Sequence, residues 1–207
     1  MIEANMAFSK DYCDFQSSRS LLRRVIRRVY INGIAKVVRG DAIDFGCGVG
    51  VFLKKLSKKS IGLEVNSCAV DFCNKQGLTV SHYNPVDDNY SLGNIRANQY
   101  GTFLMIHVLE HISGSREVME KIMGTCARLG IRRLIFVVPC FKGFLSDKTH
   151  CEFIDLDFFR SFDSTYGYKI SEKRYFPFNN SRIGRYFKYN ELWAIYDRKM
   201  EEQRVVD

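Results

Sequence analysis

The sequence of 207 residues has little proline, no long apolar segment and no C-x-x-C motif, and each absence excludes a class of protein. Its 3 prolines and 15 glycines exclude collagen-like and low-complexity chains. The longest apolar run, residues 134–141, is far short of the roughly 20 residues that cross a bilayer. The first residues lack a basic segment followed by an apolar one, so we expect no secretory signal. We therefore expect a cytoplasmic protein with a single domain, residues 1–207.

The seven cysteines also argue against an extracellular fold stabilised by disulfide bonds or by a zinc site. Their number is odd, and no pair has the spacing typical of a zinc ligand pair or a redox motif. The pattern favours a reducing compartment in which these thiols act as small buried apolar side chains.

Positive charge is present, and it is concentrated near the N-terminus. Residues 1–40 hold eight basic and three acidic side chains, whereas residues 41–207 hold 23 and 20. Nucleic-acid binding is therefore not expected, because it requires a basic stripe on the body of the protein. We divide the domain into a basic N-terminal arm, residues 1–39, and a core, residues 40–200.

Residues 17–39 have the pattern of a basic amphipathic helix. Its apolar side chains at helical spacing are Leu21, Leu22, Val25, Ile26, Val29 and Ile34. Its opposite face carries Arg23, Arg24, Arg27 and Arg28. The helix either covers the sheet with its polar face outward or docks on an anionic membrane surface.

The core alternates between strands and helices. Apolar runs predict strands over residues 42–45, 60–63, 78–83, 100–106 and 133–138. Helices are predicted over 51–58, 66–75, 113–128 and 156–164. Two further strands, 169–178 and 191–198, are joined by a connection too short for a helical crossover, so we expect them to be antiparallel. The fold class is α/β: a mostly parallel, Rossmann-like sheet with helices on both faces and a C-terminal antiparallel hairpin.

The strongest motif is the segment DFGCGVG, residues 44–50, at the turn from the first strand into the next helix. Glycines there allow a tight turn and a close approach of the backbone to a ligand. Glu64 follows Asp44 by 20 residues, at the end of the second strand, where a carboxylate can accept both hydroxyls of a ribose. Asp44 would repel a pyrophosphate but attract a cation, so the motif favours an adenosyl ligand with ammonium and sulfonium groups over a dinucleotide.

These residues resemble the class I S-adenosylmethionine (SAM)-dependent methyltransferases of the small-molecule, type 11-like branch. DFGCGVG is similar to the family's first motif and IGLE, residues 61–64, to its second. Residues 100–112, which include VLEHI, are similar to its fourth strand and the segment after it. The resemblance covers about residues 40–200 and implies a seven-stranded sheet and SAM as the cofactor.

The resemblance also implies a role for individual residues. The methionine and ribose portions of SAM would be lined by Asp44, Gly46, Cys47, Gly48 and Gly50. Glu64 would hold the ribose hydroxyls, Val65 would flank the adenine, Asn84 would lie near its amino group and His107 near the donor methyl. The sequence departs from the family at Gly101 and Ile106, where an acidic and a polar residue are usual.

Histidines are the expected proton acceptors for a hydroxyl acceptor. We predict His150, in a polar loop after the fifth strand, or His107 as the general base, and His150 as an alternative substrate ligand. His111 and His82 are expected to have structural roles. No metal is predicted, because the ends of the fourth and fifth strands lack clustered carboxylates.

Residues 153–193 are dense in aromatic side chains interleaved with arginines. Arg182, Arg185 and Tyr186 could bind a phosphate or carboxylate and stack on a sugar ring. Residues 175–192 are similar to small methyltransferases of bacterial surface-polysaccharide synthesis. Together with the basic arm, this resemblance implies O-methylation of a sugar or a cell-envelope precursor at the inner face of a membrane. Since no metal is predicted, we expect the reaction to be metal-independent.

Three alternatives remain open at this point. The chain could methylate a lipid or a quinone-like small molecule. It could be a SAM-fold module without catalysis that binds a partner through residues 17–39, or, with less support, an RNA-binding methyltransferase. The sequence leaves the acceptor and the oligomeric state open.

Overall fold

A computed structural model describes the backbone of residues 21–198 and the side chains from residue 29 onward. The described residues do not include residues 1–20 of the predicted arm or the end of the predicted core. The described side chains do not include those of the arginine-rich face of the N-terminal helix. Over residues 21–198, no helix combines the length and apolar character that a membrane crossing requires.

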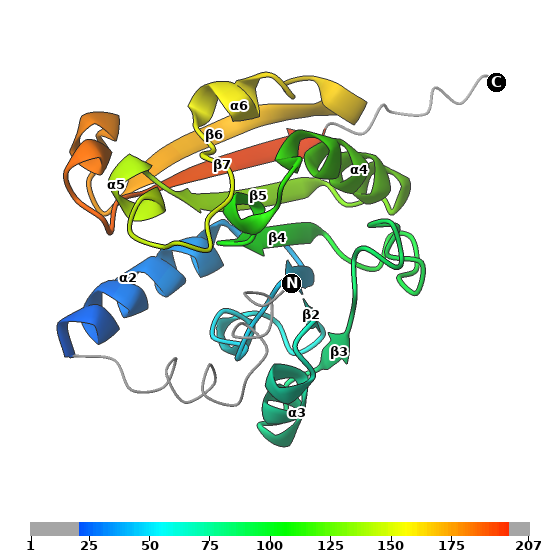
Figure 1. Cartoon of the computed structure of the whole chain (residues 1–207). Coiled ribbons are helices and arrows are strands. Elements are labelled where there is room, and N and C mark those ends of the chain that lie inside the picture. Colours follow the sequence, from blue (N-terminus) through cyan, green and yellow to red (C-terminus); the bar gives the residue numbers. More distant parts are fainter. Residues whose placement is uncertain (1–20, 199–207) are drawn as a thin grey trace.

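Seven strands form one mixed sheet in the order β3-β2-β1-β4-β5-β7-β6 (Figure 1). They span Ala42–Phe45 (β1), Ile61–Glu64 (β2), Val80–His82 (β3), Thr102–Ile106 (β4), Arg133–Pro139 (β5), Tyr168–Phe176 (β6) and Glu191–Arg198 (β7). Strands β1 to β5 are parallel, and β7 is antiparallel to both β5 and β6. The predicted fold class and its C-terminal hairpin are confirmed.

The described α-helices range in length from 4 to 17 residues. The α-helices span Leu21–Val37 (α2), Ser67–Lys75 (α3), Ser115–Arg128 (α4), Phe141–Phe144 (α5) and Leu156–Arg160 (α6). Short 3₁₀ turns span Leu53–Lys55 (η2), Leu109–His111 (η3), Thr165–Gly167 (η4) and Ser181–Arg185 (η5).

The core lies in two layers, one on each face of the sheet. Along β4, Phe103 and Met105 pack with α4 and α6, whereas Leu104 and Ile106 pack with α2. This alternation follows from the opposite directions of successive side chains in a strand. Figure 1 shows α2 on one side of the sheet and α4 and α6 on the other, as predicted.

Helix α2 covers the sheet, one of its two predicted roles. Tyr30, Ile31, Ile34 and Val37 are buried against β4, β5 and β7. Val29, which was predicted to belong to the apolar face, is 56% exposed instead.

The predicted helix over residues 51–58 is wrong, because only the turn η2 forms there. Lys54 and Lys58, and likewise Lys55 and Lys59, are four residues apart, so a helix would bring like charges together. The helix predicted from Ser113 begins two residues later, at α4, where the Glu152 carboxylate accepts the backbone N–H of Ser115 at 2.9 Å. The predicted helix over 156–164 ends at Arg160.

Candidate active site

The predicted cofactor residues gather at the edge of the sheet where the parallel strands end. Phe45, the last residue of β1, pairs with Leu63 of β2 on one side and with Met105 of β4 on the other. The segments that follow these strands therefore begin side by side. Ligands of doubly wound sheets bind in the crevice at this edge.

The glycines of residues 44–50 differ in what they face. A Cβ on Gly46 would lie 2.5 Å from Cγ2 of Val108, and one on Gly50 would lie 2.5 Å from Cδ1 of Leu78. Gly48, with a φ of +53°, has no heavy atom within 4 Å of the position where a Cβ would be. Gly48 is therefore the glycine that leaves open space, while Gly46 and Gly50 allow close packing. Cys47 is buried, with its sulfur against Gly62 of β2.

The Glu64 carboxylate is fixed by two backbone donors. One oxygen accepts the N–H of Gly48 at 2.7 Å, and the other accepts the N–H of Asn66 at 2.9 Å. Each oxygen keeps further acceptor capacity. A hydroxyl-bearing ligand above Gly48 would therefore meet a carboxylate that is already oriented.

Asp44 is a buried carboxyl group with an unpartnered oxygen. It is 1% exposed, and its Oδ2 has no hydrogen-bond partner among the described residues. Burial, and then the Glu64 carboxylate, raise the pKa of Asp44 from 3.8 to about 7. A cationic group beside it would supply the missing partner. The ammonium and sulfonium of SAM have this charge, so the residues present fit this cofactor.

The two residues predicted at the adenine lie at the same edge. Val65 directly follows β2 and is 37% exposed. Asn84 follows β3, where its amide donates to Asp87 at 2.7 Å and its carbonyl oxygen accepts the N–H of Val86. Asn84 thus shapes its own turn in the absence of a ligand.

His107 lies in the first turn after β4, with a φ of +54°. Its Nδ1 is 3.1 Å from Oε1 of Glu110, and its Nε2 is 3.0 Å from Oε1 of Glu191. Burial lowers the pKa of His107, but the carboxylates of Glu191 and Glu110 outweigh it and raise the pKa to about 10. Both ring nitrogens are thus occupied, and neither offers a free lone pair to an acceptor.

The sequence analysis missed two groups around His107. The hydroxyl of Tyr30, from α2, lies 3.2 Å from Nε2 of His107, and Glu191 begins β7. These residues are 77 and 84 positions from His107 in the sequence, so no local pattern could connect them. The sheet order connects them, because Glu191 pairs with Pro139 at the end of β5.

His150 lies close to the VLEHI segment. Its Nδ1 is 2.8 Å from the carbonyl oxygen of Phe144, and its Nε2 is 4.0 Å from Oε1 of Glu110. Its ring stacks on Phe144 and meets the edge of His111, with ring centroids 4.7 Å apart in the histidine pair. The structure therefore brings together the two candidate bases, His107 and His150, around one buried carboxylate.

The predicted acceptor residues lie at the surface. Arg182, Arg185 and Tyr186 are exposed on or next to η5, and Tyr186 is 84% exposed. Turn η5 packs on the segment that follows β5: Gly184 lies so close to Cys140 that a Cβ added to this glycine would clash with the cysteine side chain. These three exposed side chains, here called the η5 rim, belong to a turn that packs on Cys140, between β5 and the loop of His150.

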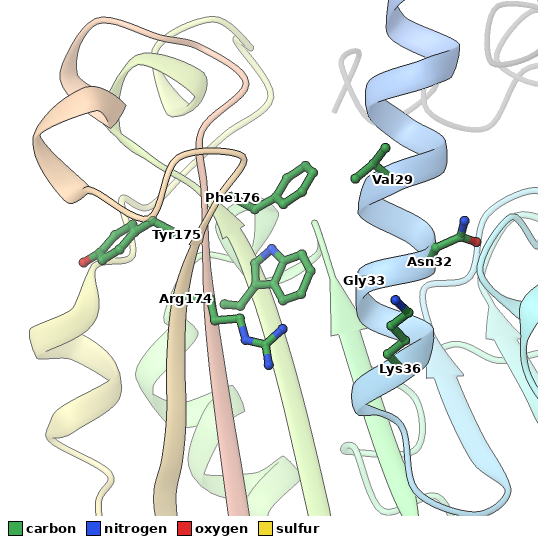
Figure 2. A pocket seen from close by; sticks show the side chains of 8 residues that line it. Val29, Asn32, Gly33, Lys36, Arg174, Tyr175 and Phe176 are labelled. Atoms are coloured by element: carbon green, nitrogen blue, oxygen red, sulfur yellow. The ribbon is translucent and has the colours of Figure 1, made fainter.

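A separate groove of about 430 Å³ lies between α2 and strands β6 and β7 (Figure 2). Two basic side chains, Lys36 and Arg174, line it together with the buried ring of Trp193. None of the residues predicted for the cofactor, for catalysis or for the acceptor lines this groove.

Solved structures with the same fold are SAM-dependent methyltransferases. Magnesium protoporphyrin IX methyltransferase of Synechocystis PCC 6803, crystallised with S-adenosylhomocysteine (SAH) and with SAM, is 14% identical; in the SAH complex the match covers 96% of this chain and 98% of that one, with a TM-score of 0.69. A SAM-dependent methyltransferase of Archaeoglobus fulgidus is 17% identical over 89% of this chain and 96% of that one, with a TM-score of 0.64.

The search of curated proteins found no match. The structural neighbours confirm the Rossmann-like methyltransferase fold, and the Synechocystis enzyme was crystallised with SAH and with SAM. The model of one sequence family, methionine biosynthesis protein MetW, matches residues 28–146, which include the glycine motif, Glu64 and the VLEHI segment. This chain, with the fold of the SAM-dependent methyltransferases, therefore belongs to the MetW family.

Proposed function

We propose that the protein transfers the methyl group of SAM to an oxygen atom of a sugar or of a sugar-containing envelope precursor. One observation carries the cofactor assignment. Two buried carboxyl groups lie close together: Glu64 accepts the N–H of Gly48, beside which space is open, and Asp44, whose pKa burial and Glu64 raise, has an unpartnered oxygen.

In this proposal two residues of the chain have separate roles in binding SAM. Glu64 holds the ribose hydroxyls, and Asp44 faces the positive charge of the cofactor. When bound, SAM supplies an electrophilic methyl group, which forms a bond to the acceptor oxygen as the carbon–sulfur bond breaks and its electron pair stays on sulfur. Correct placement of the two reactants supplies much of the rate of such a displacement.

His150 is the better placed of the two candidate bases. Its Nδ1 bonds to a backbone carbonyl, so Nε2 carries the lone pair that can take the acceptor proton. His107 has both nitrogens engaged by carboxylates. It serves in this proposal as a cationic group that holds Glu110 and Glu191 in place beside the site.

The acceptor assignment rests on the exposed rim. Arg182 and Arg185 can bind phosphate or carboxylate, and Tyr186 can stack on a sugar ring. A lipid or quinone-like acceptor is the alternative, and it would not require this basic rim. Because the matched family is described by methionine biosynthesis, amino-acid acceptors belong in the same screen.

The cofactor is tested by calorimetric titration of SAH into the wild type, Glu64→Ala and Glu117→Ala. Glu117 is an exposed helix residue that pairs with Lys121, so its variant is a matched control. We expect micromolar binding to the wild type and the control, and at least tenfold weaker binding to Glu64→Ala. Equal binding of SAH to all three proteins, or no binding of SAH to any of them, contradicts the proposal.

The acceptor site is tested by methyl transfer from labelled SAM to a panel of nucleotide-linked and lipid-linked sugars. His150→Ala and Arg185→Ala should lose turnover but keep the SAH affinity of the wild type. Arg160→Ala, which removes an exposed arginine paired with Asp157, should keep both. Full turnover in the first two variants would remove the acceptor assignment.

We also propose that the protein contacts an anionic membrane surface through residues 17–39. The arginines at positions 23, 24, 27 and 28 support this proposal, because basic side chains on one helix are attracted to anionic lipid headgroups. A lipid-linked acceptor would then be met at the membrane surface.

A further inference from the structure

We propose that Glu110, His111 and His150 form a binding site for a divalent transition metal ion of the zinc class. The three side chains each offer one ligand atom, and these atoms all lie within 4.8 Å of one another. Two imidazoles and one carboxylate form a donor set that suits zinc, iron, cobalt or nickel better than magnesium or calcium.

The separations are close to those of a loaded site. Ligands about 2.1 Å from a tetrahedral ion lie about 3.4 Å from one another. Nε2 of His150 and Oε1 of Glu110 are 4.0 Å apart. Loading therefore requires the ligand atoms to move closer by on the order of an ångström, which side-chain rotation can supply.

Both histidines are oriented as metal-binding histidines usually are. Nδ1 of His150 lies 2.8 Å from the carbonyl oxygen of Phe144, and Nδ1 of His111 lies 3.2 Å from the carbonyl oxygen of Thr149. Each Nδ1–H donates to its carbonyl, which leaves the lone pair of each Nε2 free. A hydrogen bond from the second ring nitrogen to a backbone carbonyl fixes the ring and the tautomer of a metal ligand.

Glu110 provides the second, independent observation. Its side chain is buried, and while Oε1 contacts Nδ1 of His107, Oε2 has no hydrogen-bond partner among the described residues. A buried carboxylate oxygen without a partner is unfavourable unless a cation or a hydrogen-bond donor meets it. Oε1 is the oxygen that lies 4.0 Å from Nε2 of His150, so a turn of the carboxylate would bring Oε2 to an ion between the two histidines.

The backbone holds the loop of His150 against Glu110. The carbonyl oxygen of Glu110 accepts the N–H groups of Cys151 at 2.7 Å and of Glu152 at 3.2 Å. Asp147 accepts both the backbone N–H and the hydroxyl of Thr149, the residue whose carbonyl orients His111. The ligands thus come from two segments that are tied together before any ion binds.

The sequence analysis predicted no metal because it considered only carboxylates at the strand ends. The site is instead built from a carboxylate and a histidine in η3 and a histidine about 40 residues later, which no short motif connects. Three protein ligands leave at least one position open, as in catalytic zinc sites.

The role of the ion rests on the proposed function. With an ion bound, Nε2 of His150 would be its ligand and could not also act as the general base proposed above, and the acceptor oxygen would occupy the open position. Its proton then passes to solvent water, because a bound cation lowers the pKa of the oxygen.

The experiment uses the full chain without a histidine tag, stripped with a chelator and titrated with Zn²⁺ by calorimetry and with Co²⁺ by visible absorption. We expect one ion per chain and a Co²⁺ spectrum typical of mixed nitrogen and oxygen ligands. His111→Ala and His150→Ala should each weaken Zn²⁺ binding by at least 100-fold. His82→Ala should bind as the wild type does, because His82 is exposed on β3, beyond β1 and β2 from the site.

SAH titration of the same preparations reports on folding and separates the two proposals. A His111→Ala variant that binds SAH but has lost Zn²⁺ supports the metal site. Wild-type protein that binds SAH but no stoichiometric Zn²⁺, or variants that bind Zn²⁺ as the wild type does, overturn it and leave the methyltransferase proposal intact. Zn²⁺ binding without SAH binding would overturn only the methyltransferase proposal.

Discussion

Asp44 is a buried carboxyl group whose ionisation changes in the neutral pH range. Its pKa is 3.8 in an unfolded chain and about 7 in the folded protein, because burial and the Glu64 carboxylate disfavour the anion. Between these values the folded state holds a proton that the unfolded state has lost. The contribution of Asp44 to stability is therefore complete below pH 3.8, is lost as the pH rises through 7, and is constant above that.

Asp44→Asn should remove this pH dependence. We expect the free energy of unfolding of the variant, relative to the wild type, to rise between pH 5 and pH 8, by about 3 kcal/mol at most. Urea unfolding of both proteins at the two pH values measures it. An identical difference at the two pH values would contradict the raised pKa.

Gly48 and Gly46 should respond differently to the same substitution. In Gly48→Ala the methyl group enters open space, so the loss of stability should be limited to the roughly 1–2 kcal/mol of a left-handed alanine, while SAH binding falls at least tenfold. In Gly46→Ala the methyl group would lie 2.5 Å from Val108, so stability should fall further. Thermal unfolding with and without SAH compares the two, and equal SAH affinity in Gly48→Ala and the wild type would contradict a cofactor above this glycine.

The place of the motif residues in the fold could be predicted because they are close in the sequence and lie at predicted strands, while their role toward a cofactor stays a prediction. Asp44, Gly48 and Glu64 lie where the motif predicted them, at the ends of adjacent strands. Tyr30 and Glu191 could not be predicted, since their proximity to His107 depends on the packing of α2 and on the position of β7 beside β5.

At the scale of elements, α2 is held to the sheet by a close contact between a glycine and an aromatic ring. A Cβ on Gly33 would lie 2.9 Å from Cη2 of Trp193, so the helix backbone rests against the indole ring. Tyr30 packs on the same ring, with centroids 5.7 Å apart. The apolar spacing predicted the helix, but not the residue that allows its close approach.

Gly33→Leu should therefore disrupt this contact. We expect a loss of about 1–3 kcal/mol from overpacking, which outweighs the gain of up to about 1 kcal/mol in helix propensity. Asn32→Leu, on the exposed side of the same helix, is the control and should unfold at nearly the same urea concentration as the wild type. If Gly33→Leu were as stable as that control, α2 would not pack on Trp193 as described.

At the scale of the molecule, the order of the strands decides which residues meet. β1 and β4 are adjacent in the centre of the sheet, so the glycine loop and the VLEHI segment lie together. The reversed direction of β7 returns Glu191 and the η5 rim to the same edge. Strand alternation predicted a mostly parallel sheet with a C-terminal hairpin but not the order of its strands. The helix over 51–58 was overpredicted because apolar spacing alone ignores the repulsion among its lysines.

The position of α2 also determines how membrane contact must be tested. Deleting residues 1–39 would remove Tyr30, Ile34 and Val37 from the core and unfold the protein. A loss of vesicle binding in the truncated protein would therefore not test the role of the arginines. Replacing the arginines at positions 23, 24, 27 and 28 with glutamine keeps the length of the helix and removes four charges. Each basic side chain near an anionic surface contributes about 1 kcal/mol, so binding to anionic vesicles should fall at least tenfold.

Flotation with vesicles of phosphatidylserine and phosphatidylcholine measures this binding. The wild type should float with the vesicles at low salt and less so at 0.5 M salt. Salt shortens the Debye length, so it screens the attraction between the arginines and the anionic headgroups. Vesicles of phosphatidylcholine alone are the control and should recruit neither protein. Because the described part of α2 already uses its apolar side chains against the sheet, any attachment should depend on charge rather than insertion. Equal flotation of the wild type and the four-glutamine variant would show that the arm does not bring the enzyme to a membrane.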